Sequence, residues 1–461
     1  MEMRFARILT LALATALAGA GCVSTPTVEK TPKSHAFSAD FESARTLAAQ
    51  GAQLSGAART ANDAQIEALL SGMDNASLSS GAAALPAGDP LYNYAGRALL
   101  RRGLPLPRPF DNAQAWTSQT AARPAADSDG YRPPVKLAVL LPLTGSLAKA
   151  AAPVRDGLMA GYYGETRRRP QVQFYDTSGN ATGALSAYQR AVAEGADYVV
   201  GPLGQDQVSA LFQQAQLPVP LLVLNRGNNP PPPGSAGFSL APEDDGVAAA
   251  EYLLARERGK ALVIHGLDDN GRRAAGSFEE RMKQRGGSVV STISVADEPG
   301  DISAALTSAA QAGVDAVFLS VKGSTARALT PQLAFAGLGA KTRVATSQLS
   351  SGTGKAEDDT ALDGIIFPTE TWTSRGVAGL PAASVAAEQL PTARGPAARL
   401  FAFGHDAWLL TGYMDKLVTA ANTRLPGATG TLQLDGFGNV VRSPSWSTFM
   451  GGYTTPVAND G

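Results

Sequence analysis

Cysteine occurs only once in this sequence, at Cys22, and histidine occurs only three times. A single cysteine excludes an intramolecular disulfide and any metal site built on paired cysteines. The histidines His35, His265 and His405 are far apart, and none has the spacing of a helical zinc motif. The formal net charge of -1 excludes an electrostatic attraction to nucleic acid. We therefore expect no nucleic-acid partner, no metal and no other cofactor.

Motifs of catalytic sites are missing as well. No G-x-S-x-G sequence is present, which argues against an α/β-hydrolase. The segment 352–355 ends in the Gly-Lys of a phosphate-binding loop, but Leu349 stands where the first glycine belongs and Ala356 where Ser or Thr should follow. The segment 268–271 resembles part of a calcium loop but lacks its terminal Glu, so a helix cap and turn is the better interpretation. The sequence predicts a protein that is not an enzyme.

The N-terminal segment has the order of a secretory signal. Two arginines precede the apolar run 8–18, which is shorter than the ~20 residues that span a bilayer. Small residues at 19–21 then lead to Cys22, a pattern that resembles a bacterial lipobox, although Gly19 stands where an aliphatic residue is usual. In such lipoproteins the cysteine is lipidated and becomes the mature N-terminus. Because Val23 follows, and not Asp, the resemblance implies the outer membrane, with the protein facing the periplasm. The alternative is an ordinary signal with a chance cysteine.

Composition divides the chain into five segments. We expect a signal peptide over 1–21, a lipidated tether over 22–38, a small helical region over 39–103, a Pro/Ala-rich linker over 104–134 and one large domain over 135–461. In the helical region, apolar residues recur at helical spacing over 39–70 and again over 90–101, whereas 75–81 predicts a loop. The linker contains six prolines, which is typical of a domain boundary.

The large domain has the pattern of parallel βαβ units. Short aliphatic runs, beginning with 136–141, alternate with amphipathic stretches. Three such units precede the polyproline run 230–233, the alternation then resumes, and a late helix over 397–421 and a hairpin over 431–441 follow. The pattern predicts an α/β fold of two doubly wound lobes, the first over about 135–242 plus 367–425 and the second over about 243–366 plus 426–452. Such lobes place a cleft at the carboxyl ends of both sheets.

Several motifs in this domain are similar to those of the type I periplasmic binding proteins. They are the opening strand and loop at 138–145, the third strand and first cleft loop at 196–203, and the start of the late helix at 403–408. Within that superfamily, the segments 154–163, 172–177, 221–225 and 430–440, with Trp446, most resemble the penicillin-binding protein activators, also called the LppC lipoprotein family. The resemblance covers roughly 135–452 and implies the periplasmic binding protein type I fold.

Membership of that family implies an outer-membrane lipoprotein that binds and activates a bifunctional peptidoglycan synthase, a class A penicillin-binding protein. Peptidoglycan itself is a further candidate partner. Larger members carry an N-terminal domain of tetratricopeptide-like helices, whereas this chain has only about a hundred poorly periodic residues there. We therefore expect residues 135–461 alone to bind the synthase. The alternative function is that of a substrate-binding lipoprotein of an ABC transporter for amino acids or amides.

The cleft loops distinguish these two functions. Amino-acid-binding members usually place two hydroxyl residues soon after a Gly-Pro, where they hold the ligand carboxylate at a helix N-terminus. Here Gly201 and Pro202 are followed by Leu203 and, shortly after, Asp206, so this anchor is missing. Polar residues at other strand ends could still face a cleft, or could simply cap those ends: Thr144, Ser146, Asp176, Thr177, Asn225 and Gln348.

Overall fold

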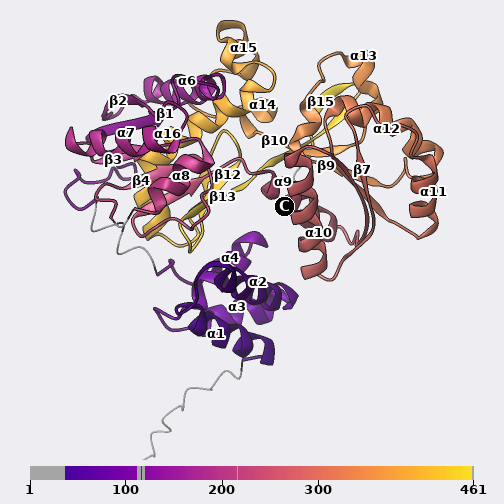
Figure 1. The fold of residues 1–461 in the computed structure, drawn as a ribbon, viewed down its shortest axis with the longest axis horizontal. Coiled ribbons are helices and arrows are strands. Elements are labelled where there is room, and N and C mark those ends of the chain that lie inside the picture. The colour runs from indigo at the N-terminus through magenta and orange to yellow at the C-terminus, as the bar shows by residue number, and fades with distance from the viewer. Residues whose placement is uncertain (1–36, 112–115, 117–119, 215, 459–461) are drawn as a thin grey trace, which may run out of the picture. The chain divides into compact units, whose positions relative to one another are not determined.

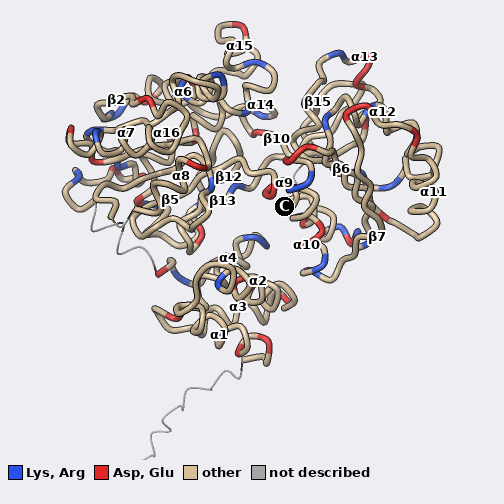
Figure 2. Tube along the Cα trace, in the orientation of Figure 1, with Lys and Arg blue, Asp and Glu red and all other residues tan. Residues whose placement is uncertain are grey.

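The computed structural model describes residues 37–111, 116, 120–214 and 216–458. The predicted signal peptide, Cys22 and nearly all of the predicted tether lie outside these residues. Among the helices of the described residues, none is long and apolar enough to cross a membrane. Figure 2 shows basic and acidic residues interspersed along the described chain.

Short helices at the start of the described chain precede the α/β elements (Figure 1). They are α1 (Ala39–Gly51), α2 (Gly56–Gly72), α3 (Asn75–Ala84) and α4 (Tyr92–Arg101). Their shared core includes Phe41, Ile66 and Leu78, all fully buried. Helix α3 lies where we expected a loop. It lacks apolar periodicity, but the Asp74 carboxylate accepts a hydrogen bond from the backbone N–H of Ser77 and so caps its first turn.

The first lobe is built on an eight-stranded sheet with the order β11-β12-β13-β5-β4-β3-β1-β2. The strands are β1 (Lys136–Leu141), β2 (Gln171–Asp176), β3 (Tyr198–Val200), β4 (Leu221–Val223), β5 (Ser235–Phe238), β11 (Leu425–Pro426), β12 (Thr431–Leu434) and β13 (Asn439–Ser443). The first five are mutually parallel, as continuous apolar runs predict.

Long helices cover this sheet and pack closely against each other. The helices of the first lobe are α6 (Ala148–Gly164), α7 (Ala181–Ala193), α8 (Gln205–Phe212), α14 (Thr371–Arg375), α15 (Ala383–Gln389) and α16 (Ala397–Thr419), with a short 3₁₀ turn η3 (Pro391–Ala393). A Cβ on Gly157 of α6 would overlap the carbonyl of Phe401, and one on Gly404 of α16 would overlap that of Val154. The two glycines therefore allow α6 and α16 to approach backbone to backbone.

The second lobe contains a seven-stranded sheet with the order β15-β14-β10-β9-β8-β6-β7. Its strands are β6 (Lys260–Gly266), β7 (Ser288–Val295), β8 (Ala316–Ser320), β9 (Thr342–Ala345), β10 (Ile366–Thr369), β14 (Ser445–Met450) and β15 (Tyr453–Pro456). Its helices are α9 (Pro242–Leu254), α10 (Asp269–Gln284), α11 (Ser303–Gln311), α12 (Gly323–Phe335) and α13 (Ala356–Asp359), with 3₁₀ turns η1 (Ser347–Ser350) and η2 (Thr360–Leu362).

The chain crosses between the two sheets three times, after β5, after β10 and between β13 and β14. This corrects the expected lobe boundaries, which assigned 426–452 as a whole to the second lobe. The hairpin β12–β13 belongs to the first lobe's sheet, because Asn439 and Val440 pair with Gly237 and Phe238 of β5. Within the segment 426–452, only the strands after Pro444 join the second sheet, where β14 pairs with β10.

Residues before β1 also contribute to the first lobe. Trp116 is only 3% exposed and belongs to the core of that lobe, with its ring edge-on to Tyr198 at a centroid distance of 5.9 Å. Its Nε1 donates to the carboxylate of Asp415 on α16 over 2.6 Å. The guanidinium of Arg132 pairs with the same carboxylate at 2.7 Å. Part of the proline-rich segment is therefore anchored to the lobe by buried contacts.

Candidate functional site

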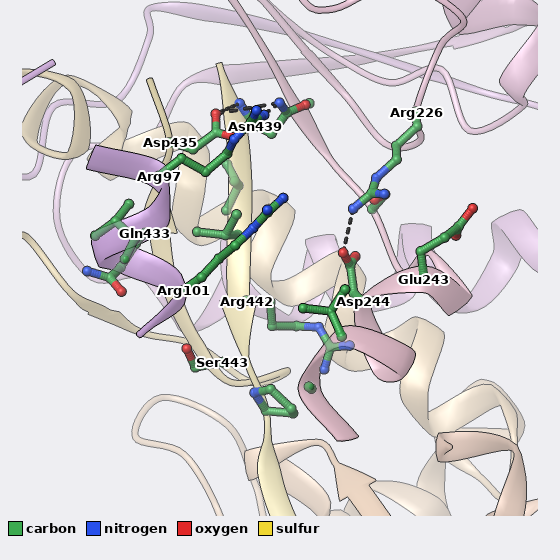
Figure 3. A pocket seen from close by; sticks show the side chains of 18 of the residues that line it. Arg97, Arg101, Arg226, Glu243, Asp244, Gln433, Asp435, Asn439, Arg442 and Ser443 are labelled. Atoms are coloured by element: carbon green, nitrogen blue, oxygen red, sulfur yellow. Dashed lines mark hydrogen bonds and ion pairs between the residues drawn. The ribbon is translucent and has the colours of Figure 1, made fainter. Parts of the chain in front are cut away.

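A cavity of about 800 Å³ lies among α4, the loop after β4, α9 and the hairpin β12–β13 (Figure 3). The residues that follow β13 and β15 complete its lining. Its volume falls within the range of roughly 300–1,000 Å³ that is typical of small-molecule sites. The cavity is therefore the candidate functional site of the described chain.

Two arginines of α4 line one wall. Arg97 and Arg101 are one helical turn apart, so their side chains share a face, and Figure 3 shows both extending from that helix. Each pairs with Glu67 on α2, Arg101 at 3.1 Å. Arg97 also lies 3.9 Å from Asp435, and its guanidinium stands over the ring of Phe437 at 4.0 Å. One shared carboxylate thus orients both cations.

The N-terminal part of α9 lines the opposite wall with carboxylates that are already paired. Both oxygens of Glu243 accept hydrogen bonds from Arg273, at 2.8 and 3.0 Å. Asp244 accepts from Arg226, which belongs to the loop after β4, and Figure 3 shows these two side chains pointing toward each other. The Arg226–Asp244 pair joins an element of the first lobe to one of the second.

Basic residues are in excess where α4, α9 and α10 adjoin. Glu251 of α9 pairs with Arg281 and lies 3.7 Å from Arg285. Burial, and then the nearby guanidiniums of Arg285 and Arg281, lower the pKa of Arg102 to about 10. Burial also lowers the pKa of Arg281, although Glu251 opposes that shift. Mutual repulsion among these cations means that the local potential favours an added anion.

An aromatic pair and a further arginine lie beyond Glu251. The rings of Tyr252 and Trp446 are 4.5 Å apart between centroids and inclined at 44°. The guanidinium of Arg256 stands 3.7 Å from the centroid of the Tyr252 ring and donates to the Tyr252 carbonyl over 3.3 Å. Among the described residues, no carboxylate lies within ion-pair distance of Arg256. This end of the cavity combines an apolar surface with a cation.

Side-chain amides line the remaining side. Asn225 donates from Nδ2 to the carbonyl of Leu203 over 2.8 Å, which connects the loops that follow β3 and β4. Asn228 and Asn229 come next in the loop, and both are exposed. An amide supplies donors and an acceptor together, so this side suits a ligand that carries both.

A second set of ion pairs ties the two lobes together next to the cavity. Asp245 of α9, almost fully buried, accepts from the backbone N–H of Ser347 over 3.0 Å and lies 3.5 Å from Arg442 on β13 and 3.7 Å from Arg399 on α16. Arg399 also lies 3.6 Å from Glu370. Burial lowers the pKa of Arg399, but the carboxylates of Asp245 and Glu370 together raise it by more, so the net effect is a raised pKa.

Of the six polar residues expected at a cleft, Asn225 lines this cavity. Thr144 donates from its hydroxyl to Asp176 over 2.7 Å, and Asp176 also accepts from the backbone N–H of Leu143 over 2.9 Å. Thr144 and Asp176 therefore satisfy each other at the ends of β1 and β2. Ser146 is exposed in the same loop.

The other two expected residues lie on different lobes. Thr177 is fully buried, and its hydroxyl has no partner among the described residues. Gln348 approaches Asp268 in the second lobe, with 3.4 Å between Nε2 and Oδ1. Leu203, which stands where a ligand-binding hydroxyl is usual, packs against the core of the first lobe.

The described residues also include no group of three His, Cys, Asp or Glu side chains that could hold a metal ion.

Sequence reasoning missed most of the cavity lining. Arg97 and Arg101 belong to a helix that we treated as peripheral, although their spacing of four residues was a visible signal of a shared basic face. Arg256 and Trp446 are almost 200 residues apart in the sequence, so no local pattern could predict that both line one cavity.

Two sheets, each flanked by helices and joined by three crossings, have the fold of the type I periplasmic binding proteins. The family described as LppC putative lipoprotein matches residues 131–452. This chain belongs to that family.

A curated relative is the penicillin-binding protein activator LpoA of Photobacterium profundum, with 27% identity over 363 residues. The match covers 70% of this chain and 57% of that protein. The chain therefore spans little more than half the length of the curated relatives it matches.

Solved structures agree on the fold. The C-domain of LpoA (YraM) from Haemophilus influenzae, a regulator of PBP1A, has a TM-score of 0.60 at 22% identity, covering 70% of this chain and all of that one. Full-length LpoA from Haemophilus influenzae also has a TM-score of 0.60, at 18% identity, covering 91% of this chain and 78% of that one. A putative branched-chain amino acid ABC transporter from Chromobacterium violaceum has a TM-score of 0.54 at 26% identity, covering 68% of this chain and all of that one.

Proposed function

We propose that this protein is an outer-membrane lipoprotein that binds a bifunctional peptidoglycan synthase, a class A penicillin-binding protein, and raises its activity. The observation that carries the proposal is the family match over residues 131–452, together with the activator among the relatives. The protein acts through contact with the synthase and has no catalytic role of its own. Its anchor is the lipid on Cys22, and peptidoglycan is a further candidate partner.

The contacts between the lobes support a regulator over a solute receptor. A receptor must open its lobes to admit a ligand and close them around it. Here Asp245 is almost fully buried between Arg399 and Arg442 of the other lobe, and Arg226 pairs with Asp244. Opening would leave the buried Asp245 carboxylate without its partners, which costs roughly 3–5 kcal/mol, whereas the exposed Arg226–Asp244 pair adds at most about 1 kcal/mol. These pairs favour one fixed arrangement of the two lobes.

The test is a reconstituted synthesis assay. Purified residues 23–461 would be titrated into glycan polymerisation and crosslinking reactions that contain each class A synthase of the same organism. We expect saturable stimulation of at least one synthase, and direct binding to it by surface plasmon resonance. A β-lactam in a parallel reaction blocks crosslinking and so shows whether polymerisation responds by itself. If no synthase binds the protein or changes its rate, the proposal is wrong.

The alternative is a substrate-binding lipoprotein of an ABC transporter for amino acids or amides. The fold likeness to a transporter component and the cavity of about 800 Å³ favour it. Against it, the loop after Pro202 offers a ligand carboxylate only apolar Leu203 and acidic Asp206. Burying a carboxylate without donors costs at least several kcal/mol, enough to abolish affinity. Calorimetry with the common amino acids should give no heat of binding, and a micromolar signal would favour the transporter.

A further inference from the structure

The charge around the cavity is unbalanced at one end. Arg97 and Arg101 share the carboxylate of Glu67, and Arg281 and Arg285 share that of Glu251. Asp435 offsets one of these four arginines, at 3.9 Å from Arg97. Arg256 adds a cation for which the described residues provide no carboxylate. The pairs elsewhere in the cavity, such as Arg226 with Asp244, are matched one to one. A bound anion would therefore be stabilised at the Arg256 end.

The anion site adjoins an apolar surface. Trp446 is half-buried, and its ring packs against that of Tyr252, the ring that the Arg256 guanidinium also contacts. Aromatic faces of this kind bury the apolar side of a ligand, and the flanking amides Asn228 and Asn229 can hydrogen-bond its polar edge. Stacking surface, amides and a cation together suit a sugar that carries a carboxylate and amide groups. A simple inorganic anion would leave the stacking surface and the amides unused.

We propose that this cavity binds a carboxylated amino-sugar fragment of peptidoglycan, a disaccharide with a short acidic peptide. The choice of peptidoglycan as the source rests on the proposed function, whereas the class of ligand rests on the lining. Arg256 binds a carboxylate, Trp446 stacks on a sugar ring, and the loop amides bind acetamido or peptide groups. The volume of about 800 Å³ is sufficient for a ligand of this size.

Trp446 allows direct measurement. The other three tryptophans, Trp116, Trp372 and Trp408, are each at most 5% exposed. Residues 23–461 would be titrated with the disaccharide-tetrapeptide released from peptidoglycan by a muramidase, while tryptophan fluorescence and heat are recorded. We expect a saturable fluorescence change with a micromolar Kd. In Trp446→Phe the fluorescence change should disappear and the Kd should rise, because phenylalanine offers a smaller stacking surface. A fluorescence change that persists in Trp446→Phe would place the ligand elsewhere and overturn the site.

Arg256 has a matched control two residues along the chain. Arg256→Gln should weaken binding at least about tenfold, because a charge-assisted hydrogen bond to a carboxylate is lost. Arg258→Gln removes the same charge from an exposed position that does not line the cavity and should leave the Kd within about twofold. Equal weakening in both variants would indicate general electrostatic attraction and overturn the site.

Two comparison ligands test the chemical class. A neutral disaccharide of N-acetylglucosamine lacks the carboxylates, and inorganic phosphate lacks the sugar. Each should bind at least about tenfold more weakly than the fragment. Equal binding by either one, or no binding of the fragment up to millimolar concentration, overturns the proposal. Because no synthase is present, failure here leaves the stimulation assay unaffected, and failure of that assay would leave a measured fragment affinity in place.

Discussion

Arg281 on α10 donates from Nη1 to the hydroxyl of Ser71 on α2 over 2.9 Å, and both residues are 3% exposed. The same guanidinium pairs with Glu251 of α9. Arg285 adds a bond to the carbonyl of Ser71 over 3.2 Å. The helices before the lobes are therefore joined to the second lobe by a buried, charge-assisted contact.

Replacing Arg281 should weaken that contact. We expect Arg281→Met to lower the free energy of unfolding by about 2 kcal/mol, because the half-buried Glu251 carboxylate and the buried Ser71 hydroxyl lose their partner while Arg285 compensates in part. Urea denaturation measures the loss, and limited trypsin digestion should release the helices before the lobes faster than in the wild type. Arg272→Met, at an exposed position of the same helix, is the control. Equal stability of the two variants would contradict this role.

Trp116 offers a second test. Removing its ring leaves a cavity beside Tyr198 and deprives Asp415 of a donor. We expect Trp116→Ala to cost about 3–5 kcal/mol of stability. Tyr163→Ala, which truncates an aromatic side chain that is 71% exposed, should cost far less. Thermal unfolding of both variants is the measurement, and a Trp116→Ala protein as stable as the control would mean that this side chain is not part of the core.

Asp406 is fully buried within α16, and its carboxylate accepts from the backbone N–H groups of Ala428 and Thr429 and from the Thr429 hydroxyl. We expect Asp406→Ala to destabilise the protein by about 3 kcal/mol or more, because buried donors are left without an acceptor. Thr429→Val removes only one donor and should cost about 1 kcal/mol. Chemical denaturation should reproduce this order, and the reverse order would refute the interpretation.

Stability at low pH should depend on Asp129. Hydrogen bonds from the Tyr413 hydroxyl and the Tyr131 N–H, and then the Arg167 guanidinium, lower the pKa of Asp129 to about 2. A carboxyl whose pKa is lower in the folded than in the unfolded state stabilises the fold above about pH 4, and that contribution is lost as the pH falls to about 2. The stability difference between wild type and Asp129→Asn should therefore be largest near neutral pH and vanish near pH 2.

The control for this pH series is Asp358→Asn, which removes an exposed carboxylate on α13. It should leave the fall in the free energy of unfolding between about pH 4 and pH 2 the same as in the wild type. If the stability difference between wild type and Asp129→Asn were the same at every pH, the Asp129 charge would not contribute, and the effect would come from its hydrogen bonds alone.

Cys22 lies outside the described residues, and its lipidation is a prediction from the order of the signal segment. Wild-type protein should incorporate labelled fatty acid in cells and fractionate with the outer membrane. Cys22→Ser should incorporate none and be released in soluble form. Labelling that persists in Cys22→Ser would refute lipidation at this residue.

The elements of the lobes were predictable, but their partners were not. The run 136–141 predicts β1 because a parallel strand buried on both faces is continuously apolar. The hairpin β12–β13 was also predicted as strands, yet its lobe was wrong. Val440 pairs with Phe238, about two hundred residues earlier, and periodicity carries no information about such a partner.

The same limit applies to the site. Asn225 was predicted because it ends a strand, whereas Arg101 and Arg256 acquire their role only from elements that fold back from distant parts of the chain. We expected residues 135–461 to suffice for binding. Trp116 and Arg132 contribute to the first lobe from before Val135, so a chain that begins at Val135 should be less stable than one that retains them.

The strand order of the second sheet has a consequence for how the protein is made. β10 is complete at Thr369, but its neighbour β14 begins only at Ser445. At roughly 5–20 residues per second, synthesis of residues 370–444 leaves that edge open for about 4–15 s. An open edge can pair with another chain, and Pro368 reduces the hazard because it offers no N–H at the position that later faces Trp446. A chain that ended prematurely before Ser445 would keep this edge exposed permanently and would be prone to aggregate.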